Sequence, residues 1–316
     1  MIDPAAVDIA LPRADAEQLT ARTAQSYWSE SWERLRANRV GMVAGAVVLL
    51  MVVIAVAAPV LATYVVHHNP YSIDLDATFS PPNGAHWLGT DEDGRDTLIR
   101  LVYGAQVTLQ VAFLSVAVAL LVGGTVGLVA GFYGGWIDNV LMRFVDTLLS
   151  IPSIYLLILL TILQPKIGPI QLTTSDPRSL AVIIAVVSWG GLSRLVRGEV
   201  LTVKNRDFVL AARSIGASDV RLLIRHLLPN VLAVMIVAAS LNVGAIIITE
   251  SVLDFIGLGI QPPTASWGNM LTNAQTYFYH STWLVALPGA SIFVTVLAMN
   301  VFGNALRDAF DPRLKS

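Results

Sequence analysis

Long apolar segments constrain this sequence of 316 residues more than any other feature. A helix needs about 20 apolar residues to cross the hydrocarbon core of a bilayer. Six segments of about that length occur, at 40–64, 105–131, 141–163, 179–198, 230–253 and 284–305. Only 13% of the residues are charged, which is too few to cover the surface of a soluble domain. We therefore expect an all-α integral membrane protein with six transmembrane helices.

The last apolar stretch is too long for a single span. Residues 255–306 contain no Asp, Glu, Lys or Arg, but several glycines and two adjacent prolines interrupt the first part of this stretch. Such residues end helices. We therefore expect a structured loop over 257–283, followed by the sixth span.

The basic residues indicate the orientation. In the six-span arrangement, 16 of the 20 Lys and Arg residues fall on one side. The positive-inside rule places this side, with both termini, in the cytoplasm. The expected parts are a cytoplasmic tail over 1–39, an external loop over 65–104, a five-helix core over 105–305 with a cytoplasmic loop at 199–229, and a C-terminal tail over 306–316. Trp28, Trp32 and Leu35 share one helical face in the first tail, which suits an interfacial helix.

Sequence motifs for catalysis or metal binding are absent. The chain has no cysteine, no phosphate-binding G-x-x-x-x-G-K-[ST] motif, no H-E-x-x-H and no nucleophile elbow. The acidic segment 91–96 fails the calcium-loop pattern, because Gly89 and Arg100 occupy its first and twelfth positions. We therefore expect a non-catalytic chain without its own cofactor or metal, and a salt-bridged external loop at 91–96.

The segment 207–229 is basic and helix-forming, and it lies between two apolar spans. We expect Asp207 to cap a short helix, and Gly216 to adopt a left-handed conformation at its end. Ser218 then caps a second helix, and Pro229 stops it before the next span. The expected apolar side of the first helix consists of Phe208, Ala211, Ala212 and Ile215. This segment either folds under its own bundle or lies in the groove of a partner protein.

Two groups of residues inside the spans are candidates for specific roles. Gly123, Gly127 and Gly131 form overlapping G-x-x-x-G steps, which allow helices to approach closely in lipid, within the chain or against a partner. Asn242 and Glu250 are polar residues in the fifth span, where such groups are costly and often functional. We expect them to face a translocation pathway.

Several motifs resemble those of one transporter family. Ala211-Ala212-x3-Gly216, followed by Leu228-Pro229, resembles the EAA loop of binding-protein-dependent ABC importer permeases, with the pattern E-A-A-x3-G-x9-I-x-L-P. Leu210 and His226 stand where that pattern has Glu and Ile. The segments 89–96, 131–138, 254–263, 266–268 and 306–313 resemble the C-type subunits of peptide importers, and nickel permeases share most of them.

This resemblance implies a type I importer permease that moves dipeptides or oligopeptides. It implies a B-type permease beside this chain, two ATPase subunits that hold ATP and Mg²⁺, an extracytoplasmic binding protein, surrounding lipids and no nucleic acid. The implied ATPase-coupling residues are Asp207, Phe208, Leu210, Ala211, Ala212, Arg213, Gly216, Ala217, Ser218, Leu228 and Pro229. The alternatives are a nickel-importer permease and, in a different class, a self-contained secondary transporter with coupling carboxylates at mid-membrane.

Overall fold

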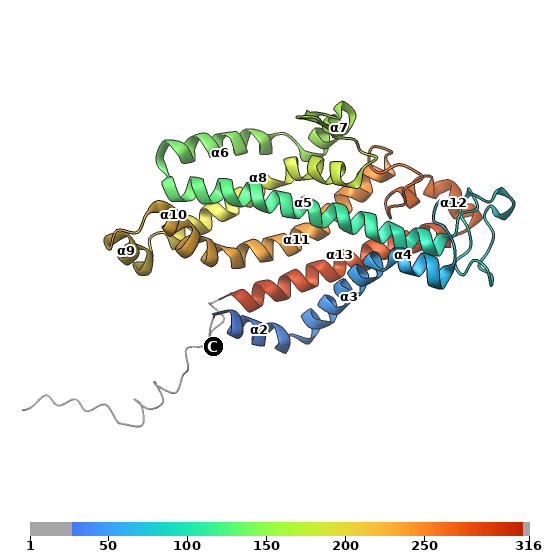
Figure 1. Cartoon of the computed structure of the whole chain (residues 1–316), viewed down its shortest axis with the longest axis horizontal. Helices are drawn as coiled ribbons and strands as arrows, with labels where there is room; N and C mark the ends of the chain where they lie inside the picture. Colours follow the sequence, from blue (N-terminus) through green and yellow to red (C-terminus); the bar gives the residue numbers. More distant parts are fainter. Residues whose placement is uncertain (1–26, 312–316) are drawn as a thin grey trace, which may run out of the picture.

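A computed structural model describes residues 27–311 as an elongated bundle of helices (Figure 1). Five helices in this part are long and apolar enough to cross a membrane. They are α3 (Arg39–Val56), α5 (Thr97–Tyr133), α8 (Pro177–Val203), α11 (Leu228–Phe255) and α13 (Trp283–Phe310). The expected tail residues 1–26 and 312–316 lie outside the described part.

The expected span over 141–163 is not one straight helix. Two helices, α6 (Gly135–Ser150) and α7 (Ser153–Leu163), occupy this region and are bent by 87° relative to each other. Pro152 explains the break, because proline disfavours the helical conformation in the residue before it, and Ile151 is extended with φ −88° and ψ 126°. Residues 27–311 thus contain five continuous candidate spans and one broken one.

The connecting elements are short. They are α2 (Tyr27–Ala37), α4 (Ala58–Leu61), the π-helix η1 (Ala62–Val66), the 3₁₀-helix η2 (Leu75–Ala77), β1 (Lys166–Ile167), β2 (Ile170–Gln171), α9 (Asp207–Ser214), α10 (Asp219–Arg221), the π-helix η3 (Leu222–Leu227), the 3₁₀-helix η4 (Asn269–Leu271) and α12 (Ala274–His280). β1 and β2 pair antiparallel and are the only strands within residues 27–311. The all-α prediction therefore holds apart from this pair of two-residue strands.

Helix α5 begins at Thr97, well before the expected start at 105. The Asp96 side chain accepts a hydrogen bond from the backbone N–H of Ile99 at 3.0 Å, which caps the first turn. The helix ends at Gly134, whose φ of +66° few other residues tolerate. The expected external loop over 65–104 is therefore shorter, because its last residues are already helical.

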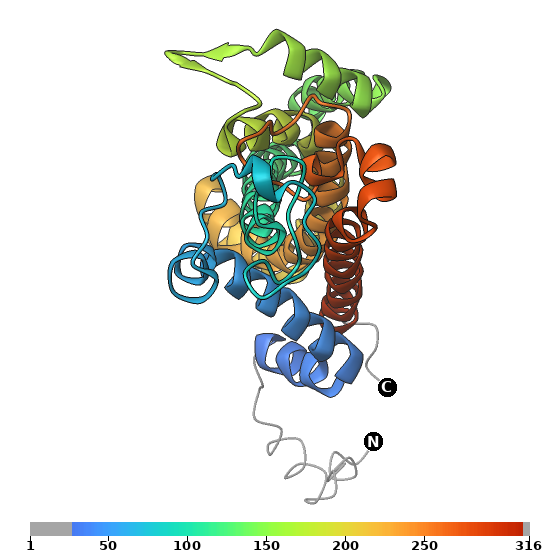
Figure 2. The same ribbon diagram turned by 90° about the vertical axis from the view of Figure 1, so that its right-hand side faces the viewer.

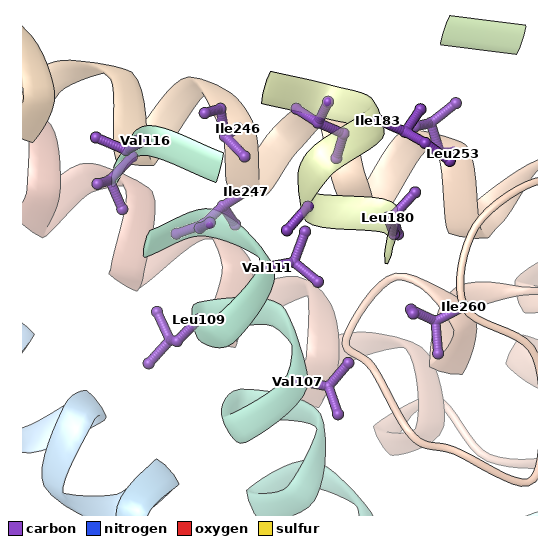
Figure 3. Close-up of a cluster of buried hydrophobic side chains, with 14 of the residues drawn as sticks. Val107, Leu109, Val111, Val116, Leu180, Ile183, Ile246, Ile247, Leu253 and Ile260 are labelled. Atoms are coloured by element: carbon purple, nitrogen blue, oxygen red, sulfur yellow. The ribbon is translucent and has the colours of Figure 1, made fainter. Parts of the chain in front are cut away.

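The main core lies where α5, α8 and α11 meet (Figure 3). Val111, Leu180 and Ile247, one from each helix, are fully buried there. The glycine stripe brings α5 against α8. A Cβ on Gly131 would lie 2.8 Å from Val200 Cβ, and a Cβ on Gly123 would lie 2.6 Å from the Trp189 carbonyl oxygen. The stripe therefore packs within the chain, an alternative that the sequence left open.

The two ends of the bundle carry different elements. Figure 1 places α9 and α10 at one end and α12, with the loops around it, at the other. Figure 2, viewed from the α12 end, shows α6 and α7 on one side of the bundle and α2 and α3 on the opposite side. Leu35 of α2 packs against Ala305 and Ala309 of α13. The side chain of Trp28 lies outside the described residues, so the expected tryptophan face is only partly visible.

Candidate functional site

Helix α9 is anchored to the bundle through two residues. Val209 is fully buried and Ala212 is 8% exposed, and both pack in a cluster that includes Phe132, Val203 and Leu227. The Arg213 guanidinium lies 5.7 Å from the centre of the Phe132 ring, which adds a cation–π contact to α5. One side of this short helix therefore packs against other helices of the same chain.

The other side of α9 is exposed and carries both apolar and polar side chains. Phe208, Leu210 and Ala211 are exposed, and Ile215 is 87% exposed. The expected apolar side, which combined Ala212 with Phe208, Ala211 and Ile215, is wrong, because the two alanines face different ways and Val209 belongs to the buried side. Apolar side chains exposed at one end of the bundle suit contact with a partner protein. We call Phe208, Leu210, Ala211 and Ile215 the α9 tip.

A glycine closes α9 in the expected conformation. Gly216 has φ +86°, its N–H donates to the Arg213 carbonyl at 3.0 Å, and the Ala217 N–H donates to the Ala212 carbonyl at 3.1 Å. These two bonds form a Schellman motif, which fixes the direction of the chain after the helix. A Cβ at Gly216 would meet nothing within 4 Å, so the constraint is conformational rather than steric.

The helix boundaries around α9 and α10 differ from the expected ones. Arg206 occupies the N-cap position of α9, Asp207 is its first helical residue, and Ser218 precedes α10 without a side-chain capping bond. Pro229 does not stop a helix, because α10, η3 and α11 form one continuous helix over 219–255. The wider π-turn at 222–227 comes directly before Pro229, where ordinary α geometry would bring a carbonyl against the proline ring. Only residues 215–218 separate α9 from this continuous helix.

Ion pairs join the neighbouring helices near this end. Asp138 of α6 accepts two hydrogen bonds from Arg197 of α8, at 2.5 and 2.6 Å. Lys204 Nζ donates to the Gly131 carbonyl at 2.7 Å. Asp146 pairs with Arg194 of α8. These contacts fix α8, from which α9 extends, to α5 and α6.

The two expected pathway residues lie in different surroundings. Asn242 is exposed on α11, and its side chain donates to the Ala238 carbonyl at 2.7 Å. Glu250 is fully buried, where it accepts from Thr108 of α5 at 3.1 Å and from Ser251 at 3.2 Å. The pathway assignment stays a prediction, and the contacts of Glu250 within the bundle are those of a group that holds α5 and α11 together.

A second polar cluster, which the sequence did not predict, holds the loop after α11. Asp254 accepts from the Ile260 N–H at 2.6 Å and from the Ser266 hydroxyl. Asn269 donates to the Thr264 carbonyl at 2.7 Å, and the Trp267 ring donates to the Leu101 carbonyl at 3.0 Å. Both 254–263 and 266–268 carry the family motifs, and this was the only signal in the sequence for the cluster.

The acidic loop is salt-bridged as expected. Arg95 contacts the carboxylates of Asp91, Glu92 and Asp93 at 2.8 to 2.9 Å, and Arg100 contacts Asp91 at 3.0 Å. Burial, and secondarily the charge of Asp91, raise the pKa of the Glu92 carboxyl. Carboxylates that already bind arginines are poor calcium ligands.

This bundle defines a multi-pass membrane protein with a short helix presented at one end. Comparison with known families identifies it more closely. Residues 123–316 match the family described as binding-protein-dependent transport system inner membrane component, and residues 26–82 match the N-terminal transmembrane domain of oligopeptide transport permease C. The chain belongs to this family of transport permeases.

Relatives of similar length support this family. The chain is 38% identical to the dipeptide transport system permease protein DppC of Alkalihalophilus pseudofirmus over 295 residues, which cover 93% of this chain and 92% of the relative. It is 37% identical to the glutathione transport system permease protein GsiD of Pectobacterium atrosepticum, covering 93% and 94%, and 34% identical to the oligopeptide transport system permease protein OppC of Bacillus subtilis, covering 100% and 97%. The inward-facing MetNI methionine ABC transporter shares the fold, with a TM-score of 0.55 and 20% identity over 67% of this chain and 97% of that one.

Proposed function

We propose that this chain is the permease subunit of an ATP-driven importer of dipeptides or oligopeptides, and that the α9 tip is where partner ATPase subunits attach. The relatives named for dipeptide, oligopeptide and glutathione transport support the substrate class. The observation that carries the coupling role is the division of α9 into a buried side at Val209 and Ala212 and an exposed apolar tip.

The arrangement of α9 suits the transmission of motion. Val209 and Ala212 fix the helix to its own bundle, so that a force on the tip reaches the core instead of turning the helix alone. The continuous helix over 219–255 then carries the displacement into the membrane-spanning part. Rigid-body movement of this kind couples two sites when the partner contacts the helix differently in its two states.

The remaining parts of the proposal rest on the similarity to transport permeases. The chain forms the pore with a second permease and receives substrate from an extracytoplasmic binding protein. ATP and Mg²⁺ bind the ATPase subunits, and this chain catalyses no reaction. The α9 end and both termini lie in the cytoplasm, which agrees with the distribution of Lys and Arg.

An exposed substitution tests the coupling role without disturbing the bundle. In Ala211→Asp, a charge enters the proposed apolar contact at a position where the folded chain itself buries nothing. We expect normal membrane insertion but loss of ATPase subunits during purification and at least roughly a tenfold loss of peptide uptake, the factor that about 1.4 kcal/mol of lost coupling produces.

The matched control is Asn205→Asp. This change adds the same carboxylate to an exposed position just before α9 and outside the tip, so we expect it to retain the ATPases and uptake. Retention of both properties by Ala211→Asp would contradict the attachment of ATPases at the tip. Uptake of Ni²⁺ but not of peptides by the intact importer would contradict the peptide substrate and leave the coupling role in place.

A further inference from the structure

A small polar cavity lies at the end of the bundle opposite α9. It has a volume of about 150 Å³, and its walls come from the acidic loop, the first turn of α5, the 261–273 segment, α12 and the start of α13. Drug-sized ligands occupy roughly 300–1,000 Å³, so this cavity holds only a small molecule or one end of a larger one.

Two buried polar atoms in this wall have no hydrogen-bond partner. They are the Thr97 hydroxyl, in a residue that is fully buried, and Nη1 of Arg100, in a residue that is 4% exposed. Arg100 is held through its Nε by Asp91, so Nη1 is free to donate elsewhere. An unpaired buried polar group destabilises the fold, and a charged one more so. Both residues line the cavity, and each holds a donor that lacks an acceptor oxygen.

The same wall also carries acceptors. Asp91 and Glu92 line the cavity beside the two unpaired groups. Asp91 is already paired with both Arg95 and Arg100, whereas Glu92 has a single ion pair, to Arg95. A ligand that satisfies this wall therefore combines an acceptor oxygen for Arg100 and Thr97 with a cationic donor for Glu92, and the two groups lie close together.

We propose that this cavity binds an α-ammonium group together with the neighbouring carbonyl or carboxylate oxygen, as in a free amino acid or the N-terminal residue of a peptide. The oxygen accepts hydrogen bonds from Arg100 Nη1 and the Thr97 hydroxyl, and the ammonium contacts Glu92. As a contact for transported peptides the cavity rests on the proposed function, but its binding of this chemical group does not.

The test uses the purified importer, with its partner subunits but without the binding protein, in lipid nanodiscs. Binding of L-alanyl-L-alanine, its N-acetyl derivative and L-alanine is measured by calorimetry. We expect the dipeptide to bind and the acetylated one to lose at least roughly tenfold in affinity, because a hydrogen bond to a charged group contributes about 1.5–3 kcal/mol. If L-alanine binds as tightly as the dipeptide, a free amino acid suffices for binding. If L-alanine does not bind, the site is specific for peptides.

Thr97→Val distinguishes a ligand site from a water-filled cavity. This change removes the unpaired hydroxyl at nearly constant shape, so we expect unchanged or higher thermal stability without ligand and a roughly three- to tenfold weaker dipeptide affinity, the loss of one neutral hydrogen bond. The matched control is Thr295→Val, because the Thr295 hydroxyl is also buried and unpaired but does not line the cavity. We expect it to leave the affinity unchanged.

Two results would overturn the site. One is no binding of any of the three probes. The other is equal binding of the free and acetylated dipeptides, unaffected by Thr97→Val. Uptake by the wild-type importer with its binding protein is measured in parallel. Peptide import without binding in the cavity rejects the cavity site alone, whereas binding without peptide import rejects the proposed transport function.

Discussion

The segments at the two ends of the bundle are attached to it by different chemistry. At the α9 end, a short helix rests on a few apolar side chains, Val209 and Ala212 among them, and leaves an apolar tip exposed. At the α12 end, long loops are fixed by buried polar groups, among them Asp254, Asn269 and Arg95.

This difference bears on how each end responds to an applied force. Apolar contacts are non-directional, so a helix that rests on them keeps its shape when it is displaced as a unit. Hydrogen bonds to buried charges are directional and costly to break, so they hold irregular backbone in one conformation. We conclude that the α9 end is suited to movement and that the α12 end is suited to rigidity.

The largest expected effect on stability comes from removing a buried acceptor at the α12 end. Asp254→Ala leaves the Ile260 N–H and the Ser266 hydroxyl without their buried acceptor. At about 1–3 kcal/mol for each unpaired group, we expect a loss of roughly 2–6 kcal/mol in stability, measured as a large fall in the melting temperature of the purified importer. Asp254→Asn keeps one acceptor oxygen and should lose less. A melting temperature unchanged in Asp254→Ala would show that these bonds do not hold the loop.

The next largest effect tests the packing of α5 against α8, the helix from which α9 extends. In Gly127→Ala, the added Cβ would lie 2.8 Å from Val196 Cβ, so α5 and α8 must separate. Overpacking of this kind costs about 1–3 kcal/mol. The control is Gly191→Ala on α8, where a Cβ meets nothing within 4 Å and the alanine favours the helix by about 1 kcal/mol. Equal melting temperatures for the two variants would contradict the close α5–α8 contact.

A smaller effect on stability, with a larger one on transport, is expected at Gly216. Gly216→Val places a β-branched residue at φ +86°, at a cost of about 1–2 kcal/mol. We expect normal insertion, with ATP hydrolysis uncoupled from peptide uptake or the ATPases released. Asn tolerates the left-handed conformation, so Gly216→Asn should retain most uptake. Similar defects in both variants would instead indicate that the loss of glycine itself, and not backbone strain, is responsible.

The smallest expected effect is pH-dependent and lies at the rigid end. The pKa of Glu92 is raised mainly by burial, so between its ordinary and its raised value the folded chain binds more protons than the unfolded chain. Stability contributed by the protonated form is therefore lost as the pH rises through this interval. Glu92→Gln should flatten this slope in melting temperature measured against pH, above an ordinary value of 4.5. An identical slope in the variant would assign the pH dependence to another group.

Local chemistry in the sequence accounts for the class of fold and for much of the 207–229 segment. Apolar length specifies a membrane bundle, because only helices of about 20 residues satisfy the backbone in lipid. The left-handed conformation of Gly216 was also predictable, since a helix end next to glycine has few alternatives. These properties depend on local chemistry, which a single segment contains.

Which side each residue faces, and which groups meet, depends on how the helices and loops pack together. The two alanines of α9 separate because the helix lies on Val203 and Leu227, which belong to other elements. Asp254 meets Ser266 only after the loop after α11 has folded back, and the wall with Thr97 and Arg100 meets the 261–273 segment only after that segment has packed near α5. Spacing along the chain contains no information on such contacts, because they depend on the relative positions of several helices at once.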